Sequence, residues 1–235
     1  MDTRRVVRAI WIATIILSLI GAAVVTRRLF SLAEPIARPG LDEGFARHAT
    51  LTRIHIIPGL LFVVLAPLQF VRRIRARWPA LHRWMGRFLV AVSMVVGGSA
   101  LVMSPQMAVG GITESAATTL FGGFFLFATI RGFIYIRRGN TRLHREWMIR
   151  AFATGMAVAA IRPIVGIFFA TSRLTHLTPH DFFGIAFWLA FTIQVLIAEM
   201  WIRYTRPHRM NSAMAEPAYA QTRIFPTSRK AQDRI

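Results

Sequence analysis

Long apolar runs alternate with short basic segments along most of the chain. Six of these runs are about as long as the ~20 residues that a helix needs to cross a bilayer. None shows the alternation of polar and apolar positions that a membrane-spanning strand requires. The pattern therefore predicts an all-α polytopic membrane protein, with its six helices in one domain over residues 1–205. The predicted spans are residues 6–26, 51–70, 84–103, 116–136, 147–170 and 182–202.

The basic residues predict which way these helices run, because cytoplasmic loops of membrane proteins are rich in Lys and Arg. If the N-terminus is cytoplasmic, the inner segments hold 19 Lys and Arg residues and the outer segments hold five. Both termini are therefore expected to be cytoplasmic, in a multi-pass protein of a bacterial inner membrane. Residues 206–235 are predicted to form a disordered basic tail that contacts anionic membrane lipid.

Composition narrows the class of protein further. The chain is 54% hydrophobic and 17% charged, against about 45–50% and ~25% in soluble domains. The net charge is +19, and the basic residues cluster between the apolar runs. They do not form a face with stacking aromatics, so a nucleic acid is not expected as a partner. Cysteine is absent, and the chain has no nucleotide-binding, metalloprotease or hydrolase motif. No catalytic residue is therefore assigned.

Two inner loops resemble each other in sequence. The first contains Leu81-His-Arg-Trp-Met-Gly-Arg-Phe88, and the second contains Leu143-His-Arg-Glu-Trp-Met-Ile-Arg-Ala-Phe152. Both runs stand where a helix turns back from the cytoplasmic face. They predict that spans 2–3 and spans 4–5 are two similar helical hairpins that form the core. The alternative is that Arg, His and Trp are simply common at membrane interfaces.

His82 and His144 open the third and fifth spans at equivalent points of these hairpins. Imidazole can bind haem iron or a transition metal while it is neutral. Two imidazoles that face each other would hold a metal ion or one b-type haem, with Arg87 and Arg150 near enough to hold the haem propionates. The alternative is that each histidine lies at the membrane interface and caps the start of its helix.

A second set of polar residues is expected near the outer surface. His55 is followed by Pro58 and a glycine, which predict a bend in the outer half of span 2. His48 would share a face with His55 if that helix extends upstream. Arg162 precedes a proline and is a candidate for binding a lipid headgroup, a quinone oxygen or a haem propionate. The alternative for Arg162 is that its side chain snorkels to the outer interface.

One acid, Glu199, stands well inside a span. A charge at mid-membrane costs at least ~2.5–3.5 kcal/mol and usually has a partner. We therefore expect Glu199 to pair with Arg131 or Arg150. The glycine pairs at residues 97–98 and 122–123 are expected to let helices pack closely.

These motifs, taken in order, resemble a family of bacterial predicted membrane proteins known as domain of unknown function 2306. The likeness covers roughly residues 45–205 and implies a polytopic inner-membrane protein without an assigned activity. The runs that carry it are His55-Ile-Ile-Pro-Gly, Pro67-Leu-Gln-Phe, Leu81-His-Arg-Trp-Met-Gly-Arg, His144-Arg-Glu-Trp-Met-Ile-Arg and Ala198-Glu-Met-Trp-Ile-Arg.

A more distant likeness is to the six-helix dihaem cytochrome b ferrireductases that accept electrons from ascorbate. Their haems lie between histidines of spans 2 and 4 and of spans 3 and 5. His82 and His144 match the second of these pairs, and His55 matches the histidine of span 2. Span 4 of this chain has no histidine, so the likeness implies one haem at most.

Three functions follow as hypotheses. The first is a redox or electron-transfer protein that binds b-type haem and passes electrons to a quinone or another acceptor. The alternative is a non-enzymatic subunit or assembly partner of a larger membrane complex, in contact with other membrane proteins. The third is a transporter of a small solute or lipid that uses the outer layer formed by Arg53, His55 and Arg162.

Overall fold

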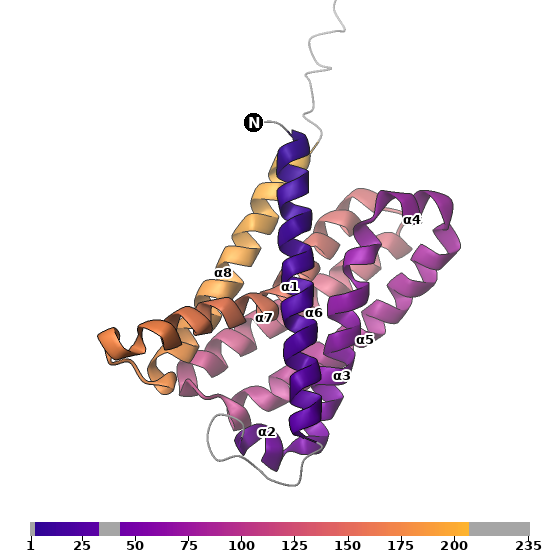
Figure 1. Cartoon of the computed structure of the whole chain (residues 1–235). Helices are drawn as coiled ribbons and strands as arrows, with labels where there is room; N and C mark the ends of the chain where they lie inside the picture. Colours follow the sequence, from indigo (N-terminus) through magenta and orange to yellow (C-terminus); the bar gives the residue numbers. More distant parts are fainter. Residues whose placement is uncertain (1–2, 33–42, 207–235) are drawn as a thin grey trace, which may run out of the picture. The chain divides into compact units, whose positions relative to one another are not determined.

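The computed structural model describes residues 3–32 and 43–206, and within these ranges the chain is helical without a strand. Six helices are long and apolar enough to cross a membrane, as the sequence predicts. Shorter helices stand in the connections between them (Figure 1). The elements are α1 (Thr3–Ser31), α2 (Glu43–Arg47), α3 (Ala49–Leu65), η1 (Pro67–Phe70), α4 (Arg72–Arg77), α5 (Pro79–Met107), α6 (Gly111–Arg137), α7 (Thr141–Thr175) and α8 (Pro179–Thr205).

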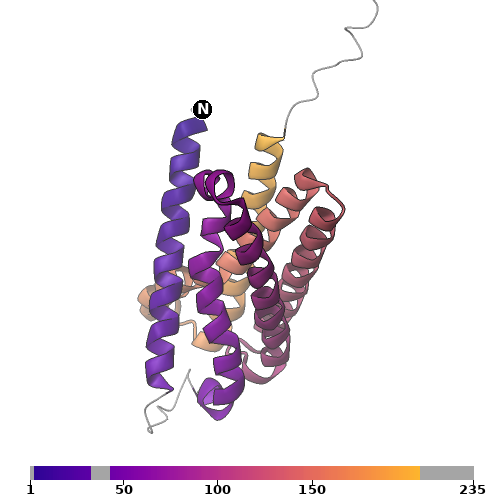
Figure 2. The ribbon, with the colours of Figure 1, turned by 90° about the vertical axis from the view of Figure 1, so that its right-hand side faces the viewer.

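Two hairpins form the core, as predicted. In the unit that ends at Ile202, α3 packs against α5, α5 against α6, and α6 against α7, while α3 also contacts α7. Helix α1 lies outside this group and contacts α3 and α7 (Figure 2). Because successive helices pack side by side, the start of α1, helix α4 and the turn between α6 and α7 share one end of the bundle. We call this end, which the charge bias predicts to be cytoplasmic, the inner end.

Small residues permit the closest helix contacts, although only one glycine of each predicted pair takes part. A Cβ at Gly97 would lie 2.5 Å from the Leu126 side chain, and one at Gly122 would lie 3.3 Å from Leu101. Their neighbours Gly98 and Gly123 have nothing within 4 Å of such a position. The sequence pairs therefore mark the contact between α5 and α6, and only one member of each pair faces it.

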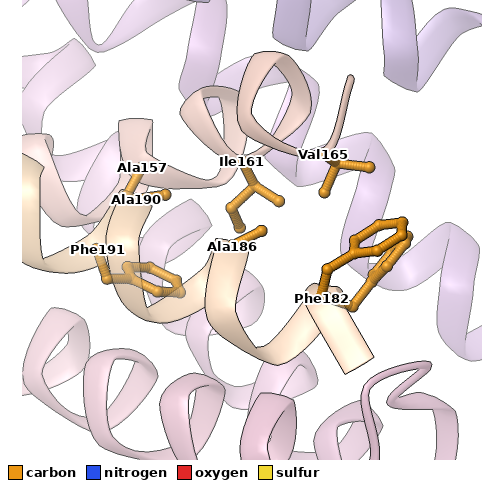
Figure 3. Close-up of a cluster of buried hydrophobic side chains, with 8 residues drawn as sticks. Ala157, Ile161, Val165, Phe182, Ala186, Ala190 and Phe191 are labelled. Carbon is orange, nitrogen blue, oxygen red and sulfur yellow. The ribbon is translucent and has the colours of Figure 1, made fainter. Parts of the chain in front are cut away.

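Aromatic rings fill the middle of the bundle. Phe62 of α3 meets Phe125 of α6 edge-on, with 5.5 Å between ring centroids. Both rings press on Gly155 of α7, where a Cβ would lie 2.5 Å from Phe62 and 3.2 Å from Phe125. A second cluster joins α7 to α8 (Figure 3), where Ile161 and Phe182 are almost fully buried. The charged side chains of the spanning helices stand nearer the two ends of the bundle than these rings do.

Helix α3 is continuous through its proline and is followed by a 3₁₀ turn at its inner end. It continues from Ala49 to Leu65 through Pro58, and the change to a 3₁₀ turn comes at Pro67. At its outer end, the helix does not extend upstream through His48, whose backbone stands at φ −111° and ψ 47° between α2 and α3. His48 and His55 therefore do not share the face of one continuous helix.

Candidate functional site

The two predicted histidines occupy equivalent places at the inner end. His82 is the fourth residue of α5, and His144 is the fourth residue of α7. The His82 N–H donates to the Trp78 carbonyl at 3.1 Å, and the His144 N–H donates to the Asn140 carbonyl at 3.0 Å. The similarity between the two loop sequences thus reflects equivalent positions in the two hairpins.

Neither imidazole caps its helix, so the capping role in that alternative is wrong, while the interfacial position stays a prediction. Helix α5 has no side-chain cap at Trp78. Helix α7 is capped by Asn140, whose side-chain oxygen accepts from the Leu143 N–H at 3.0 Å. The turn before this cap closes because Gly139 adopts a positive φ of 74°, which glycine tolerates and most residues do not.

His144 is held in one tautomer. Its Nδ1 lies 2.9 Å from the backbone carbonyl oxygen of Gly132 on α6. A carbonyl oxygen only accepts hydrogen bonds, so Nδ1 carries the proton and the neutral ring keeps its lone pair on Nε2. Metal-ligating histidines have this arrangement, because the bond at one ring nitrogen orients the other and increases its basicity.

His82 is half-buried and less completely bonded. Its Nδ1 is buried, and no described group makes a hydrogen bond to it. The same is true of Nε2 of Gln69 in the 3₁₀ turn, whose amide oxygen lies 3.4 Å from where a Cβ of Gly86 would stand. A buried polar atom without a partner costs about 1–3 kcal/mol. Both atoms can therefore bond to a group that the described residues do not provide.

The two imidazoles are electrostatic neighbours. His144 acts on His82, as do Arg75 of α4 and Arg83 of α5. The inner end therefore brings together, from three elements, a pair of histidines and a set of positive charges. We call His82 and His144 the histidine pair.

Of the two partners predicted for Glu199, the structure pairs it with Arg150. Nε of Arg150 donates to one carboxylate oxygen of Glu199 at 2.5 Å, and its terminal nitrogen donates to the other at 2.9 Å. This two-bond arrangement is the strongest geometry of an Arg–carboxylate pair. Arg131, the other candidate, donates to the Tyr135 hydroxyl at 2.5 Å. The ring of Trp147 lies near both guanidinium groups, 4.8 Å from that of Arg150 and 5.8 Å from that of Arg131.

Arg87, predicted with Arg150 to hold haem propionates, has different surroundings. Its side chain is exposed, and its guanidinium lies 5.3 Å from the Trp84 ring. Arg150 is already bound by Glu199, so its charge is neutralised within the chain. Of these two arginines, only Arg87 remains open to an external anion.

The outer residues lie away from the histidine pair. Arg162 follows His144 by 18 residues of α7, which is about 27 Å along the helix, and it acts electrostatically on Glu114. Nδ1 of His55 lies 3.0 Å from the Ser99 hydroxyl, which itself donates to the Val95 carbonyl at 2.6 Å. Arg53 donates to the Leu32 carbonyl. The layer predicted for a transporter is therefore divided among different partners.

Sequence reasoning missed Glu146, which it placed in an inner loop. This side chain is only 2% exposed, and it acts electrostatically on the neighbouring Arg145. The signal was present in the sequence, because Glu146 is inserted between the Leu-His-Arg and Trp-Met-x-Arg parts that the two runs share. An acid inserted into an otherwise repeated motif indicates a difference in surroundings.

The donor set favours haem over a bare metal ion. Protein sites for zinc use three or four side-chain ligands, and no group of three or more His, Cys, Asp or Glu with suitable spacing exists within residues 3–32 and 43–206. Haem iron takes four ligands from its porphyrin and requires only axial ligands from the protein. Two histidines are sufficient for that purpose.

Comparison with known proteins identifies a family. A family model described as "Predicted membrane protein (DUF2306)" matches residues 52–202, which contain the histidine pair and both hairpins. No curated protein and no solved structure matches the chain.

Proposed function

Because the chain belongs to the DUF2306 family of predicted membrane proteins, whose description assigns no activity, we propose a function from the site alone. We propose that this multi-pass protein of a bacterial inner membrane binds one b-type haem between His82 and His144 and transfers electrons. One observation carries the proposal. Two histidines at equivalent places of two hairpins are electrostatic neighbours, and one is held in the tautomer of an axial ligand.

Several residues of the inner end would contribute to haem binding. The Gly132 carbonyl fixes the His144 ring, so that its free Nε2 is the ligating atom. Arg75 already acts on His82, and its charge would attract the carboxylates of the haem. When bound, haem supplies a centre that gains and loses one electron. Nearby positive charge stabilises the reduced form, because reduction adds a negative charge.

The outer end does not support a second haem. His55 is bonded to Ser99 on α5, and α6 has no histidine in residues 111–137. A quinone or a membrane protein is the expected electron partner, because the histidine pair lies at an end of the bundle, beside the exposed Arg83 and Trp84. The reaction that the transferred electron drives would depend on that partner.

The test is a reduced-minus-oxidised absorption spectrum of the full chain, purified in mild detergent from haem-supplemented cells. We expect a b-type band in the native protein and its loss in both His82→Ala and His144→Ala. His55→Ala is the matched control, since it removes a half-buried imidazole from the other end and should leave the band unchanged. A folded protein without a band would contradict the proposal.

A further inference from the structure

The first hairpin has a large excess of positive charge. From residue 44 to residue 113 the chain contains eight arginines and no acid. The acids whose side chains the structure describes are engaged or buried elsewhere. Glu114 accepts from the Gly110 N–H, Asp181 binds Thr178, Glu199 binds Arg150, and Glu146 is almost fully buried. Among the described side chains, neither Arg83 nor Arg87 of this hairpin has a carboxylate partner.

Six of the eight arginines are at the inner end and are exposed: Arg72, Arg73, Arg75, Arg77, Arg83 and Arg87. Four of them belong to α4, and the last two are four residues apart on α5. Residues four apart lie on the same side of a helix. Arg83 and Arg87 therefore point their charges to one side of α5.

Aromatic and aliphatic side chains extend this surface around α5, from Arg87 through Trp84 and Phe88 to Leu81, which is almost opposite Arg83. Trp84 is 68% exposed, and Leu81 and Phe88 are about half exposed. We call these five residues (Leu81, Arg83, Trp84, Arg87 and Phe88) the α5 outer face. A tryptophan beside arginines, with apolar residues around them, is the composition found at the headgroup level of a membrane.

The second hairpin has an arginine at the position equivalent to Arg87, and that arginine binds a carboxylate. Arg150 has the same position as Arg87 in the repeated motif Trp-Met-x-Arg, and a carboxylate from α8 binds it through two hydrogen bonds. Both arginines also lie about 5 Å from the tryptophan of their motif. The equivalence indicates that Arg87 too is placed to receive an oxyanion.

We propose that the α5 outer face binds an anionic phospholipid, with the phosphate held by Arg83 and Arg87. A phosphate oxygen pair suits a guanidinium as well as a carboxylate does. Arg87 is the ninth residue of α5, about 12 Å along the helix, and a long arginine side chain at that depth snorkels to the headgroup layer. The acyl chains would lie along Trp84 and Phe88. The charge of α4 favours a lipid with net negative charge over a zwitterionic one.

The test uses the full chain in detergent and native mass spectrometry with added phosphatidylglycerol or phosphatidylcholine. We expect the native protein to prefer phosphatidylglycerol. Each arginine near an anionic surface contributes a few-fold in affinity, so the double variant Arg83→Gln/Arg87→Gln should lower phosphatidylglycerol binding about 10- to 30-fold. Arg137→Gln/Arg138→Gln removes the same charge from exposed positions at the same end and should change binding less than threefold.

Other outcomes would overturn the proposal. Equal losses in the two double variants would show diffuse attraction to the whole inner end and no defined site. Unchanged lipid binding, together with loss of a co-purifying membrane protein in Arg83→Gln/Arg87→Gln, would show that a partner helix with its own acid covers the face. An unchanged unfolding temperature in both double variants verifies that neither result reflects misfolding.

Discussion

The first turns of α5 and α7 carry nearly the same residues in different surroundings. At the start of α5, Trp84 is 68% exposed and Arg87 has no carboxylate partner among the described side chains. At the start of α7, Trp147 lies between two guanidinium groups, and Arg150 is only 13% exposed in its pair with Glu199. The same motif is thus exposed in the first copy and packed against other helices in the second.

The inserted Glu146 accounts for part of this difference. Trp84 follows His82 by two residues, which is about 200° around a helix, whereas Trp147 follows His144 by three residues, about 300°. The tryptophan is therefore almost opposite the histidine in α5 and within about 60° of it in α7. One extra residue is enough to move the tryptophan from the side opposite the histidine to nearly the same side.

The packing of the helices accounts for the rest. Helix α7 contacts α1, α3 and α6, and its buried residues also pack against α8. Helix α5 is packed against α3 and α6, with short α4 at its start. The side of α7 that bears Arg150 is covered by another helix, and the matching side of α5 is not. Whether the arginine of this motif is neutralised within the chain therefore depends on the helix that packs against it, and not on the motif itself.

The largest expected effect on stability comes from removing Glu199, the acid of α8 that pairs with Arg150. Glu199→Gln leaves the Arg150 charge within the membrane without its carboxylate. Breaking a buried ion pair costs about 3–5 kcal/mol, and the partial exposure of Glu199 puts the expected loss of unfolding free energy at about 2–4 kcal/mol. Titration with SDS from mixed micelles measures it.

Arg87→Gln is the matched control for this change, because it removes the equivalent charge from the uncovered copy. We expect it to alter the unfolding free energy by no more than about 0.5 kcal/mol, as at other exposed sites. The double variant Arg150→Met/Glu199→Leu should recover part of the loss, since it leaves no charge unpaired. Equal losses in Glu199→Gln and Arg87→Gln would contradict the difference between the copies.

The two tryptophans should differ by a smaller amount. Trp147→Ala removes the ring that Arg131 and Arg150 share and that meets Phe127 edge-on at 5.3 Å. Full truncation of a buried tryptophan costs about 3–5 kcal/mol, so a half-buried one should cost about 2–3 kcal/mol. Trp84→Ala should cost less than about 1 kcal/mol. The same SDS titration ranks them, and the reverse order would mean that α5 is covered in the folded protein.

The fold could be predicted from the sequence almost completely. The length of each apolar run fixes the helices, since a bilayer leaves few alternatives for a spanning segment. The predicted runs fall inside the observed spanning helices, which begin and end a few residues further out. Proline at residue 79 and glycine at residue 139 then mark where helices begin and end.

The candidate site could be predicted only in part. The equivalence of His82 and His144 was readable because it is local in the sequence. The choice of Arg150 over Arg131 by Glu199, the bond from His144 to Gly132 and the burial of Glu146 depend on how helices are rotated against each other. A periodicity places residues on a face but does not say which neighbour meets that face. The tail, residues 207–235, lies outside the described residues, so its predicted disorder stays a prediction.

The histidine pair offers a third test of the comparison, in protein prepared without haem. His144→Phe removes the hydrogen bond to the Gly132 carbonyl, and a bond of this kind contributes about 1 kcal/mol. His82→Phe removes a buried Nδ1 that has no described partner, so it should leave stability unchanged or raise it slightly. Opposite signs in the SDS titration would support the assigned bonding. A loss of similar size in both variants would show that His82 has a partner in the apo-protein.

The smallest expected effect concerns the position before the arginine, which is Gly86 in the first copy and Ile149 in the second. Ile149 is packed in a cluster with Ala198 and Ile202, whereas a Cβ at Gly86 would meet only the Gln69 amide oxygen, at 3.4 Å. Alanine is preferred to glycine within a helix by about 0.5–1 kcal/mol. Gly86→Ala should therefore stabilise the protein by up to about 0.5 kcal/mol, while Gly155→Ala should not, because its new methyl group would lie 2.5 Å from the buried Phe62 ring. If Gly86→Ala instead destabilises the protein, the space beside Gln69 is already filled by a group that the chain itself does not provide.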